Sequence, residues 1–387
     1  MPWRLSSGKR PPTPSSDPRQ TDPQPLLMLL MLLQSDARDL PTRSVGTGVY
    51  NFSMSSQQSF PCLVVRRGED GAISCAVEET TVDALPPGDV LIQVAGSSLN
   101  YKDALACRAH EGIVKSLPHV PGIDCVGRVV ESSSPEYCPS DPVLVTGYEL
   151  GSGQWGGFAE YVRVPAEWVV RLPAELTPDE AMTYGTAGFT AAQCVERIVN
   201  HGIKPSDGEI VVTGSTGGVG CLAVALLAKL NYRVAAVTGK PEQAALLTRL
   251  GAATILPREE VSDAADRPLL KSRWAAAVDT VGGPVLATLV RSLAYRGCVT
   301  ACGLVAGDQL PLTVYPFLLR GVTLYGIDSA KCPRAPRLEI WRRLSLEWKL
   351  HDLEFLRREV TLSELPAAVE QMLAGKSHGR VLVRPHA

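Results

Sequence analysis

The feature that most constrains the fold is a glycine-rich run in the middle of the chain, GSTGGVG at residues 214–220. The β-branched run Glu209–Thr213 comes directly before it, and an apolar run of helical length, Cys221–Leu230, comes directly after it. Glycines between a strand and a helix allow the tight turn of a βα unit, because they have no Cβ atom to clash with the turning backbone. We therefore predict that this part of the chain forms a parallel sheet.

The residues after Leu172 alternate between strand and helix patterns, as expected for successive βαβ units. This alternation is typical of a Rossmann-type α/β domain with a doubly wound parallel sheet. The predicted helices lie at 178–185, 190–200, 221–230, 242–250 and 284–294, and the predicted strands at 209–213, 233–237, 254–256, 276–279, 298–302 and 323–326.

The residues on both sides of this region have a different pattern. Short β-like runs separated by glycine and proline turns fill the part from Cys62 to Leu172, and a similar run lies at 380–383. Two further helices are predicted before that last run, at 336–349 and 366–374. The predicted organisation is a Rossmann domain at 188–327 inserted in a mainly β domain, of which 61–187 form the first part and 328–387 the C-terminal return.

The first 60 residues are predicted to be a disordered extension. Residues 1–25 include seven prolines, and such a composition neither forms a helix nor buries a core. The apolar run Leu26–Leu33 is shorter than the about 20 residues of a membrane helix, and no small-residue cleavage site follows it. We expect a cytoplasmic protein. An organelle presequence and a downstream start at Met54 are alternatives, so the sequence leaves open whether residues 1–53 are present in the mature protein.

Composition excludes several classes of partner. The 38 Lys and Arg residues nearly balance the 40 Asp and Glu residues, so no electrostatic nucleic-acid binder is expected. The ten cysteines include no C-x-x-C pair, which argues against a disulfide framework or a zinc knuckle. We expect a soluble protein with a small-molecule substrate, without a nucleic-acid or membrane partner.

The glycine turn also predicts a dinucleotide site. Its backbone could approach a pyrophosphate, whose charge meets the free N–H groups at the start of the following helix. A site for NAD usually has an acidic residue at the end of the second strand, whereas this chain has Thr238, Gly239 and Lys240 there. A hydroxyl and an ammonium group suit the 2′-phosphate of NADP(H). Glu242 is interpreted as complementing a helix dipole, and the alternative for Lys240 is a solvated surface lysine.

A series of further segments can be compared with known families: Ser97–Ala104, Pro121–Asp124, Trp155–Glu160, Gly185–Ala191, Glu209–Gly214, Trp274–Gly283, Ala301–Leu304, Pro316–Gly321, Gly326–Ser329 and Gly379–Val383. In this order they resemble the medium-chain dehydrogenase/reductase superfamily, and within it the zinc-free quinone oxidoreductase branch of the YhdH/YhfP type, which includes acrylyl-CoA reductases of the AcuI type. The resemblance extends from about residue 62 to the C-terminus.

The resemblance implies a GroES-like catalytic domain, a Rossmann domain, a cleft between them and a homodimer. It also implies contacts with NADP(H). These are Tyr101, Leu304, Leu318 and Ser329 at the nicotinamide, Thr216, Gly217, Gly218 and Val219 at the phosphates, Thr238, Gly239, Lys240 and Arg258 at the adenosine 2′-phosphate, and Gly375 in a segment that closes the site.

The resemblance further bears on metal binding. Zinc-dependent relatives have a cysteine where Asn100 stands and a histidine where Ile123 stands. Neither Asn100 nor Ile123 supplies the thiolate or imidazole that a zinc site requires. No metal is therefore expected.

The implied activity is NADPH-dependent reduction of an activated C=C bond. In a 2-enoyl thioester such as acrylyl-CoA, hydride would go to the β-carbon, hydrogen-bond donors would stabilise the enolate oxygen, and a proton would reach the α-carbon. Tyr101 is the catalytic candidate, either as proton donor or only as a cofactor contact, and the alternative is a packed tyrosine. Asp103 is interpreted as structural.

Two other activities share these motifs with the first. One is reduction of quinones, enones or enals, and the other is NADPH binding without catalysis. A basic rim near the cleft would favour a CoA substrate, and Lys102, Arg108 and Lys115 are the residues that could form it.

Overall fold

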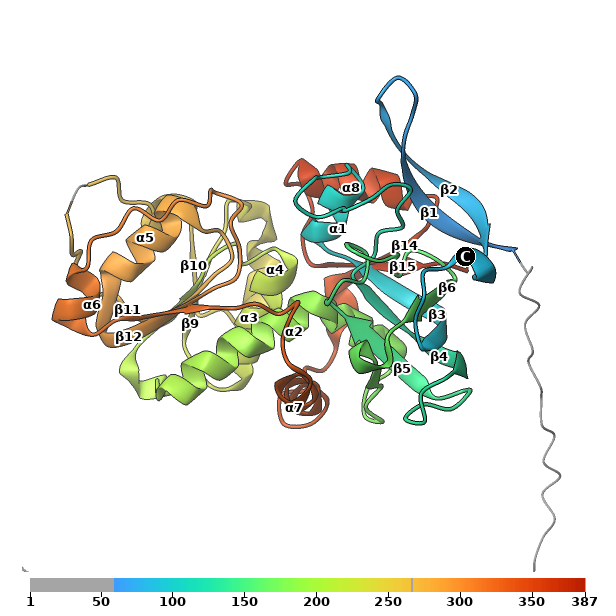
Figure 1. Ribbon diagram of the computed structural model, residues 1–387. Helices are drawn as coiled ribbons and strands as arrows, with labels where there is room; N and C mark the ends of the chain where they lie inside the picture. Colours follow the sequence, from blue (N-terminus) through green and yellow to red (C-terminus); the bar gives the residue numbers. More distant parts are fainter. Residues whose placement is uncertain (1–58, 266, 387) are drawn as a thin grey trace, which may run out of the picture. The chain divides into compact units, whose positions relative to one another are not determined.

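The computed structural model describes residues 59–386 except residue 266 (Figure 1). The apolar run 26–33 and the alternatives for residues 1–53 lie outside the described residues. The first strand, β1 (Ser59–Arg67), includes two residues that the sequence assigned to the extension. The physical reason is that Phe60 is buried, with its ring 5.1 Å from that of Tyr161. Among the helices of the described chain, none has the length and apolar character needed to cross a membrane.

A six-stranded parallel sheet forms the Rossmann part of the fold, with the strand order β10-β9-β8-β11-β12-β13. Side chains that alternate along one strand point to opposite faces of a sheet. Val212 of β8 packs with helices α2 and α3, whereas Val211 packs on the other face with helix α5. Burial on both faces explains why these strands are almost wholly apolar. The strands are β8 (Ile210–Val212), β9 (Val234–Val237), β10 (Thr254–Leu256), β11 (Trp274–Asp279), β12 (Leu293–Ala301) and β13 (Thr323–Gly326).

The helices of this part connect the parallel strands, and Figure 1 shows α5 on one side of the sheet and α2 and α3 on the other. The helix after the glycine turn begins at Gly218, three residues earlier than predicted. The glycine run therefore provides both the turn and the first helical turn. The helices are α3 (Gly218–Lys229), α4 (Ala244–Arg249), α5 (Gly283–Ser292) and α6 (Tyr315–Arg320).

A seven-stranded sheet with the order β14-β15-β3-β4-β5-β7 forms the mainly β part, and β6 pairs with β3 off this path. The C-terminal strand β15 pairs antiparallel with β3, which places Val381 opposite Leu99. This pairing joins the C-terminal strand to the sheet that contains β3. The strands are β3 (Val90–Leu99), β4 (Asp124–Ser132), β5 (Pro142–Thr146), β6 (Tyr161–Val164), β7 (Val170–Arg171), β14 (Arg357–Thr361) and β15 (Arg380–Arg384), and a separate hairpin joins β1 to β2 (Ile73–Thr81).

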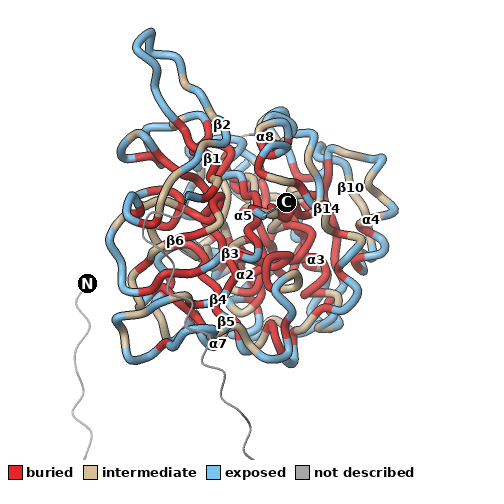
Figure 2. Tube along the Cα trace, turned by 90° about the vertical axis from the view of Figure 1, so that its right-hand side faces the viewer, coloured by how far each residue is buried: buried red, intermediate tan, exposed pale blue. Residues whose placement is uncertain are grey.

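Helix α2 (Pro178–His201) joins the cores of the two sheets. The sequence predicts two helices here, at 178–185 and 190–200, and the structure has two helical parts that meet at Gly185, where the backbone is not helical. Gly185 has φ 50° and ψ −156°, a backbone conformation that favours glycine. Figure 2 shows the buried residues gathered along α2, α3 and the central strands β3 and β4. The other helices are α1 (Tyr101–Ala106), α7 (Arg334–Ser345) and α8 (Leu365–Leu373).

Candidate active site

The glycine turn lies between β8 and α3, and hydrogen bonds hold it at both ends. Thr213 donates to the buried carboxylate of Asp279 at 2.7 Å, and the hydroxyl of Ser215 donates to the Val212 carbonyl at 2.7 Å. A Cβ atom on Gly220 would clash with the backbone of Gly214. The N–H groups of the first turn of α3, at Gly218 to Gly220, have no acceptor within the helix. The turn therefore offers donors at a positive helix end, where phosphate groups bind.

The residues predicted for the 2′-phosphate lie together after β9. The hydroxyls of Thr216 and Thr238 are 3.4 Å apart, and the Lys240 N–H donates to the Thr238 hydroxyl at 3.0 Å. A Cβ atom on Gly239 would clash with the Arg258 guanidinium, so this glycine lets the cation lie against the backbone. The structure thus brings the four residues predicted for the 2′-phosphate into one group with Thr216 of the glycine turn.

Lys240 also contacts the segment between α8 and β15. Its ammonium group donates to the Ser377 carbonyl. Burial lowers the pKa of Lys240, and the positive charge of Arg258 lowers it further, whereas the negative charge of Glu242 acts in the opposite direction. The hydroxyl of Ser377 is buried and has no hydrogen-bond partner within the described chain. A buried hydroxyl without a partner, on the residue whose carbonyl binds the Lys240 ammonium group, fits a further acceptor such as a phosphate.

The same segment closes over the glycine turn. The Gly379 N–H donates to the Thr216 carbonyl at 2.9 Å, and Gly375 has φ +69° with open space around its Cα atom. The segment that includes Gly375 therefore lies near the phosphate side of the site.

The residues predicted at the nicotinamide are less tightly connected. Tyr101 is the first residue of α1 and its side chain is 46% exposed. The Ser329 hydroxyl accepts a hydrogen bond from Thr190 at 2.7 Å, which ties it to α2. Leu304 and Leu318 are also exposed, at 68% and 75%.

A buried polar cluster lies behind Tyr101, and the sequence did not identify it as such. The Asp124 carboxylate accepts hydrogen bonds from the Ser98 hydroxyl at 2.5 Å, the Asn100 amide at 2.8 Å and the Thr186 hydroxyl at 2.5 Å. Arg380 donates to the Ser98 hydroxyl at 2.9 Å, to Asn100 Oδ1 at 3.2 Å and to the Thr183 carbonyl at 2.9 Å. Six residues from four segments are fixed in this way.

Arg380 connects the polar cluster to the glycine turn. A Cβ atom on Gly218 would lie 2.9 Å from Nη1 of Arg380, so the guanidinium packs directly against the start of α3. Burial lowers the pKa of Arg380, and the negative charge of Asp124 opposes that effect. The signal in the sequence was the segment Gly379–Val383, which had been used only to support the resemblance.

Asp103 holds the loop next to this cluster. Its carboxylate accepts hydrogen bonds from the N–H groups of Asn100 at 2.8 Å, Gly122 at 3.1 Å and Ile123 at 2.8 Å. Burial, together with the nearby charge of Asp124, raises the pKa of Asp103 to about 7. These contacts fit the structural interpretation of Asp103.

The three residues of the expected basic rim do not all contact the same part of the chain. Arg108 forms an ion pair with Glu370 of α8. Lys102 lies 3.5 Å from the Ser152 hydroxyl, and Lys115 pairs with Glu149 at 2.5 Å. Only Lys102 and Lys115 therefore reach the same loop, 147–154.

Two family models match this chain. One, described as an alcohol dehydrogenase GroES-like domain, matches residues 86–174, and the other, described as a zinc-binding dehydrogenase, matches residues 218–343.

Curated relatives match over most of the described chain. Acrylyl-CoA reductase AcuI of Ruegeria pomeroyi is 45% identical over 325 residues, which are 84% of this chain and 98% of that protein. The putative quinone oxidoreductase YhfP of Bacillus subtilis is 45% identical over 326 residues, with the same shares covered. The probable acrylyl-CoA reductase AcuI of Escherichia coli is 45% identical over 316 residues, 82% of this chain and 97% of that one.

Solved structures have the same fold. The YhdH oxidoreductase of Salmonella enterica in complex with NADP has a TM-score of 0.81 and 45% identity, and covers 84% of this chain and 99% of its own. The Bacillus subtilis YhfP structure with NAD bound has a TM-score of 0.82 and 44% identity, with equal coverage. The GroES-like and Rossmann parts expected from the sequence are therefore confirmed.

Proposed function

Since this chain belongs to the medium-chain dehydrogenase/reductase superfamily, and within it to the branch of YhdH, YhfP and AcuI, we propose that it is an NADPH-dependent reductase of an activated C=C bond. The proposed substrate is acrylyl-CoA or a related 2-enoyl thioester. The observation that carries this proposal is the 45% identity to AcuI over 98% of that protein.

NADP(H) is the proposed cofactor, and three features of this chain fit it. The start of α3 offers free N–H donors for the pyrophosphate, with Thr216, Gly217, Gly218 and Val219 in the turn. Lys240 and Arg258 supply two positive charges beside the Thr238 hydroxyl, where a 2′-phosphate would bind. The unsatisfied Ser377 hydroxyl supplies a further donor there. The bound YhdH structure holds NADP, whereas the YhfP structure holds NAD.

The nicotinamide end is proposed to lie between Tyr101 and Ser329, with Leu304 and Leu318 along it and the segment of Gly375 closing the site. The nicotinamide supplies the hydride for the β-carbon of the acceptor. In this chain, the Tyr101 hydroxyl either holds the proton for the α-carbon or orients the cofactor. The polar cluster around Asp124 fixes Asn100, and thereby the start of α1 on which Tyr101 lies.

We also propose that the site contains no zinc. The Asn100 amide is engaged on both sides, by Asp124 and by Arg380, and the side chain of Ile123 has no donor atom. Neither position offers a thiolate or an imidazole. Metal analysis of the purified protein tests this point: about one zinc per chain would contradict it.

A homodimer is proposed on the basis of exposed apolar side chains near β12 and α6. Val305, Val314, Leu318 and Leu319 are each more than half exposed. Contiguous apolar patches of this kind often mark contacts between subunits.

The proposed domain boundaries stay those of the sequence: 61–187 and 328–387 for the catalytic domain, and 188–327 for the Rossmann domain.

Reduction of a quinone, enone or enal is the second candidate, because one relative of equal identity is named a putative quinone oxidoreductase. Oxidation of NADPH, followed at its absorbance with acrylyl-CoA, crotonyl-CoA, a quinone and an enal, separates the two. A clear preference in kcat/KM for the thioesters supports the proposal, and a preference for the quinone or enal overturns it. NADPH binding without any turnover would indicate the non-enzymatic alternative.

A further inference from the structure

Three lysines from separate parts of the chain lie around the loop 147–154, which contains Glu149: Lys115 pairs with Glu149, Lys102 lies by Ser152, and Lys331 follows Ala330, whose carbonyl binds the loop. Lys115 pairs with the Glu149 carboxylate at 2.5 Å and is 68% exposed. The hydrogen bond from Lys115 lowers the pKa of Glu149, and the positive charges of Lys102 and Lys331 act in the same direction. We call these three residues the lysine cluster.

The backbone holds the parts of this cluster together. The Tyr148 N–H donates to the Ala330 carbonyl at 2.9 Å, which fixes the loop of Glu149 beside Lys331. The ammonium group of Lys102 lies 3.5 Å from the Ser152 hydroxyl, three residues after Glu149. The cluster is therefore built on an ordered loop and does not depend on one flexible side chain.

Two lysines of the cluster are close in the chain to residues proposed for the reaction. Lys102 directly follows Tyr101, and Lys331 comes two residues after Ser329. Both Tyr101 and Ser329 are proposed to flank the nicotinamide. A substrate whose reactive end meets these two residues would bring its remaining groups to the lysines.

The cluster has a surplus of positive charge. Three lysines stand against two carboxylates here: Glu149, which pairs with Lys115, and Asp328, which accepts from the backbone N–H of Lys331 at 3.2 Å. Unpaired ammonium groups at the surface attract phosphate groups, with which they form charge-assisted hydrogen bonds.

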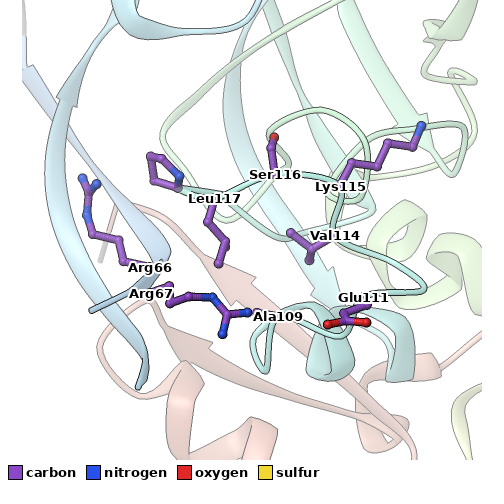
Figure 3. Close-up of a pocket in the computed structure, with 9 residues that line it drawn as sticks. Arg66, Arg67, Ala109, Glu111, Val114, Lys115, Ser116 and Leu117 are labelled. Atoms are coloured by element: carbon purple, nitrogen blue, oxygen red, sulfur yellow. The ribbon is translucent and has the colours of Figure 1, made fainter. Parts of the chain in front are cut away.

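A neighbouring pocket is a weaker candidate for the same ligand. It has a volume of about 700 Å³ and is lined by Arg66, Arg67, Glu111 and Lys115 among others. Figure 3 shows that the Lys115 side chain points away from Arg67. Arg66 is already paired with Glu78 at 2.7 Å, and Glu111 adds a negative charge. The surplus charge is therefore on the Glu149 side of the loop.

We propose that Lys102, Lys115 and Lys331 bind the phosphate groups of a coenzyme A thioester and so select this substrate over uncharged enones. This inference rests on the proposed function, because it assigns a binding site to the substrate named there. The thioester end would lie at Tyr101, and the phosphates would replace Glu149 as partners of the lysines.

The test compares two substrates with the same reactive group: acrylyl-CoA, and S-acryloyl-N-acetylcysteamine, which has no phosphate. The measured quantity is the ratio of kcat/KM for acrylyl-CoA to that for the truncated thioester. K115A and K331A should each lower this ratio about three- to fivefold, the size expected for partly exposed charge pairs. E149Q should raise it, because the competing carboxylate is lost. The matched control is K229A, at the exposed end of α3.

Opposite signs for the lysine variants and E149Q would not result from a general loss of structure. An unchanged ratio in K115A and K331A overturns this inference, while the reductase proposal stands. A lower ratio in R67A would then indicate that the neighbouring pocket, which Arg67 lines, binds the phosphates instead. If the wild-type protein reduces neither thioester, both the proposed function and this inference are overturned. The ratio in the wild type should also fall as salt is added, because salt screens exposed charges.

Discussion

Asp124 of β4 and Arg380 of β15 are bridged by one hydroxyl group, that of Ser98, which donates to the carboxylate at 2.5 Å and accepts from the guanidinium at 2.9 Å. Both charged residues are almost fully buried, at 0% and 2% exposed. A buried charge is tolerated when its partners satisfy it, and it becomes costly when one partner is removed. Through Ser98 of β3, these hydrogen bonds connect β4 with the C-terminal strand β15.

Arg380→Met should destabilise the protein by about 3–5 kcal/mol, because it leaves the Asp124 carboxylate without its buried counter-charge. The free energy of unfolding in urea measures this change. Arg66→Met, at an ion pair that is half exposed, is the control and should cost at most about 1 kcal/mol. Adding Asp124→Asn to Arg380→Met should restore part of the lost stability. Equal losses in the two single variants would contradict this account.

Tyr101→Phe separates the two roles proposed for this residue. If the hydroxyl donates the proton, kcat with acrylyl-CoA should fall about 100-fold or more, while the Kd for NADPH stays unchanged. If the residue only orients the cofactor, the Kd should rise and kcat should change little. Steady-state kinetics and a fluorescence titration with NADPH measure both values. No change in either would identify Tyr101 as a packing residue.

Lys240→Ala should weaken NADPH binding far more than NADH binding, because only NADPH has the 2′-phosphate that the ammonium group would meet. Loss of a hydrogen bond to a charged group costs about 1.5–3 kcal/mol, so the KM for NADPH should rise roughly tenfold or more. Arg258→Ala should act in the same direction. Equal effects on the two cofactors would show that Lys240 is an ordinary surface lysine.

The buried carboxylate of Asp103 predicts a pH dependence of stability. Its pKa in the folded protein is about 7, above that of an unfolded aspartate. Between these two values the folded state binds more protons than the unfolded state, so the stability contributed by this group falls as the pH rises through that window and is constant above it. Asp103→Asn should flatten the slope of unfolding free energy against pH between about 4 and 7. A slope as steep as in the wild type would argue against this assignment.

Leu319→Asp tests the proposed subunit contact. A charge at this 59% exposed apolar position should convert a dimer into monomers, because the charge would be buried without a partner in the contact. Light scattering after size exclusion measures the mass. A wild-type monomer, or a variant that stays dimeric, would refute the contact.

The strength of the sequence pattern decided how much of the fold could be predicted. Buried parallel strands such as β8 and β11 have continuous apolar runs, and these were predicted with their helices. Strand β2 was missed because none of its side chains is buried, which leaves no apolar alternation in the sequence. The break predicted between two helices corresponds to the non-helical backbone at Gly185.

The residues of the site also differ in whether a local sequence pattern could identify them. Thr238, Gly239 and Lys240 could be assigned from their position after a strand, because the geometry of a βα unit is local. Arg380 and Ser377 could not, because their partners are far away in the sequence and only the folded chain brings them to the glycine turn. The lysine cluster combines both cases: Lys102 and Lys115 were expected near the cleft, whereas Lys331 joins them only through the contact between Tyr148 and Ala330.

The order of the strands along the chain bears on how the protein is made. All six strands of the Rossmann sheet precede residue 327, so that sheet can form while the ribosome is still adding residues, since domains generally fold as units during synthesis. The other sheet lacks its strand β15, and Asp124 lacks Arg380, until residues 380–384 have left the ribosome. Termination before residue 380 would therefore leave an exposed edge on β3 and an unbalanced buried charge. We expect such shortened chains to aggregate or be degraded, which expression of a chain ending at residue 379 would show.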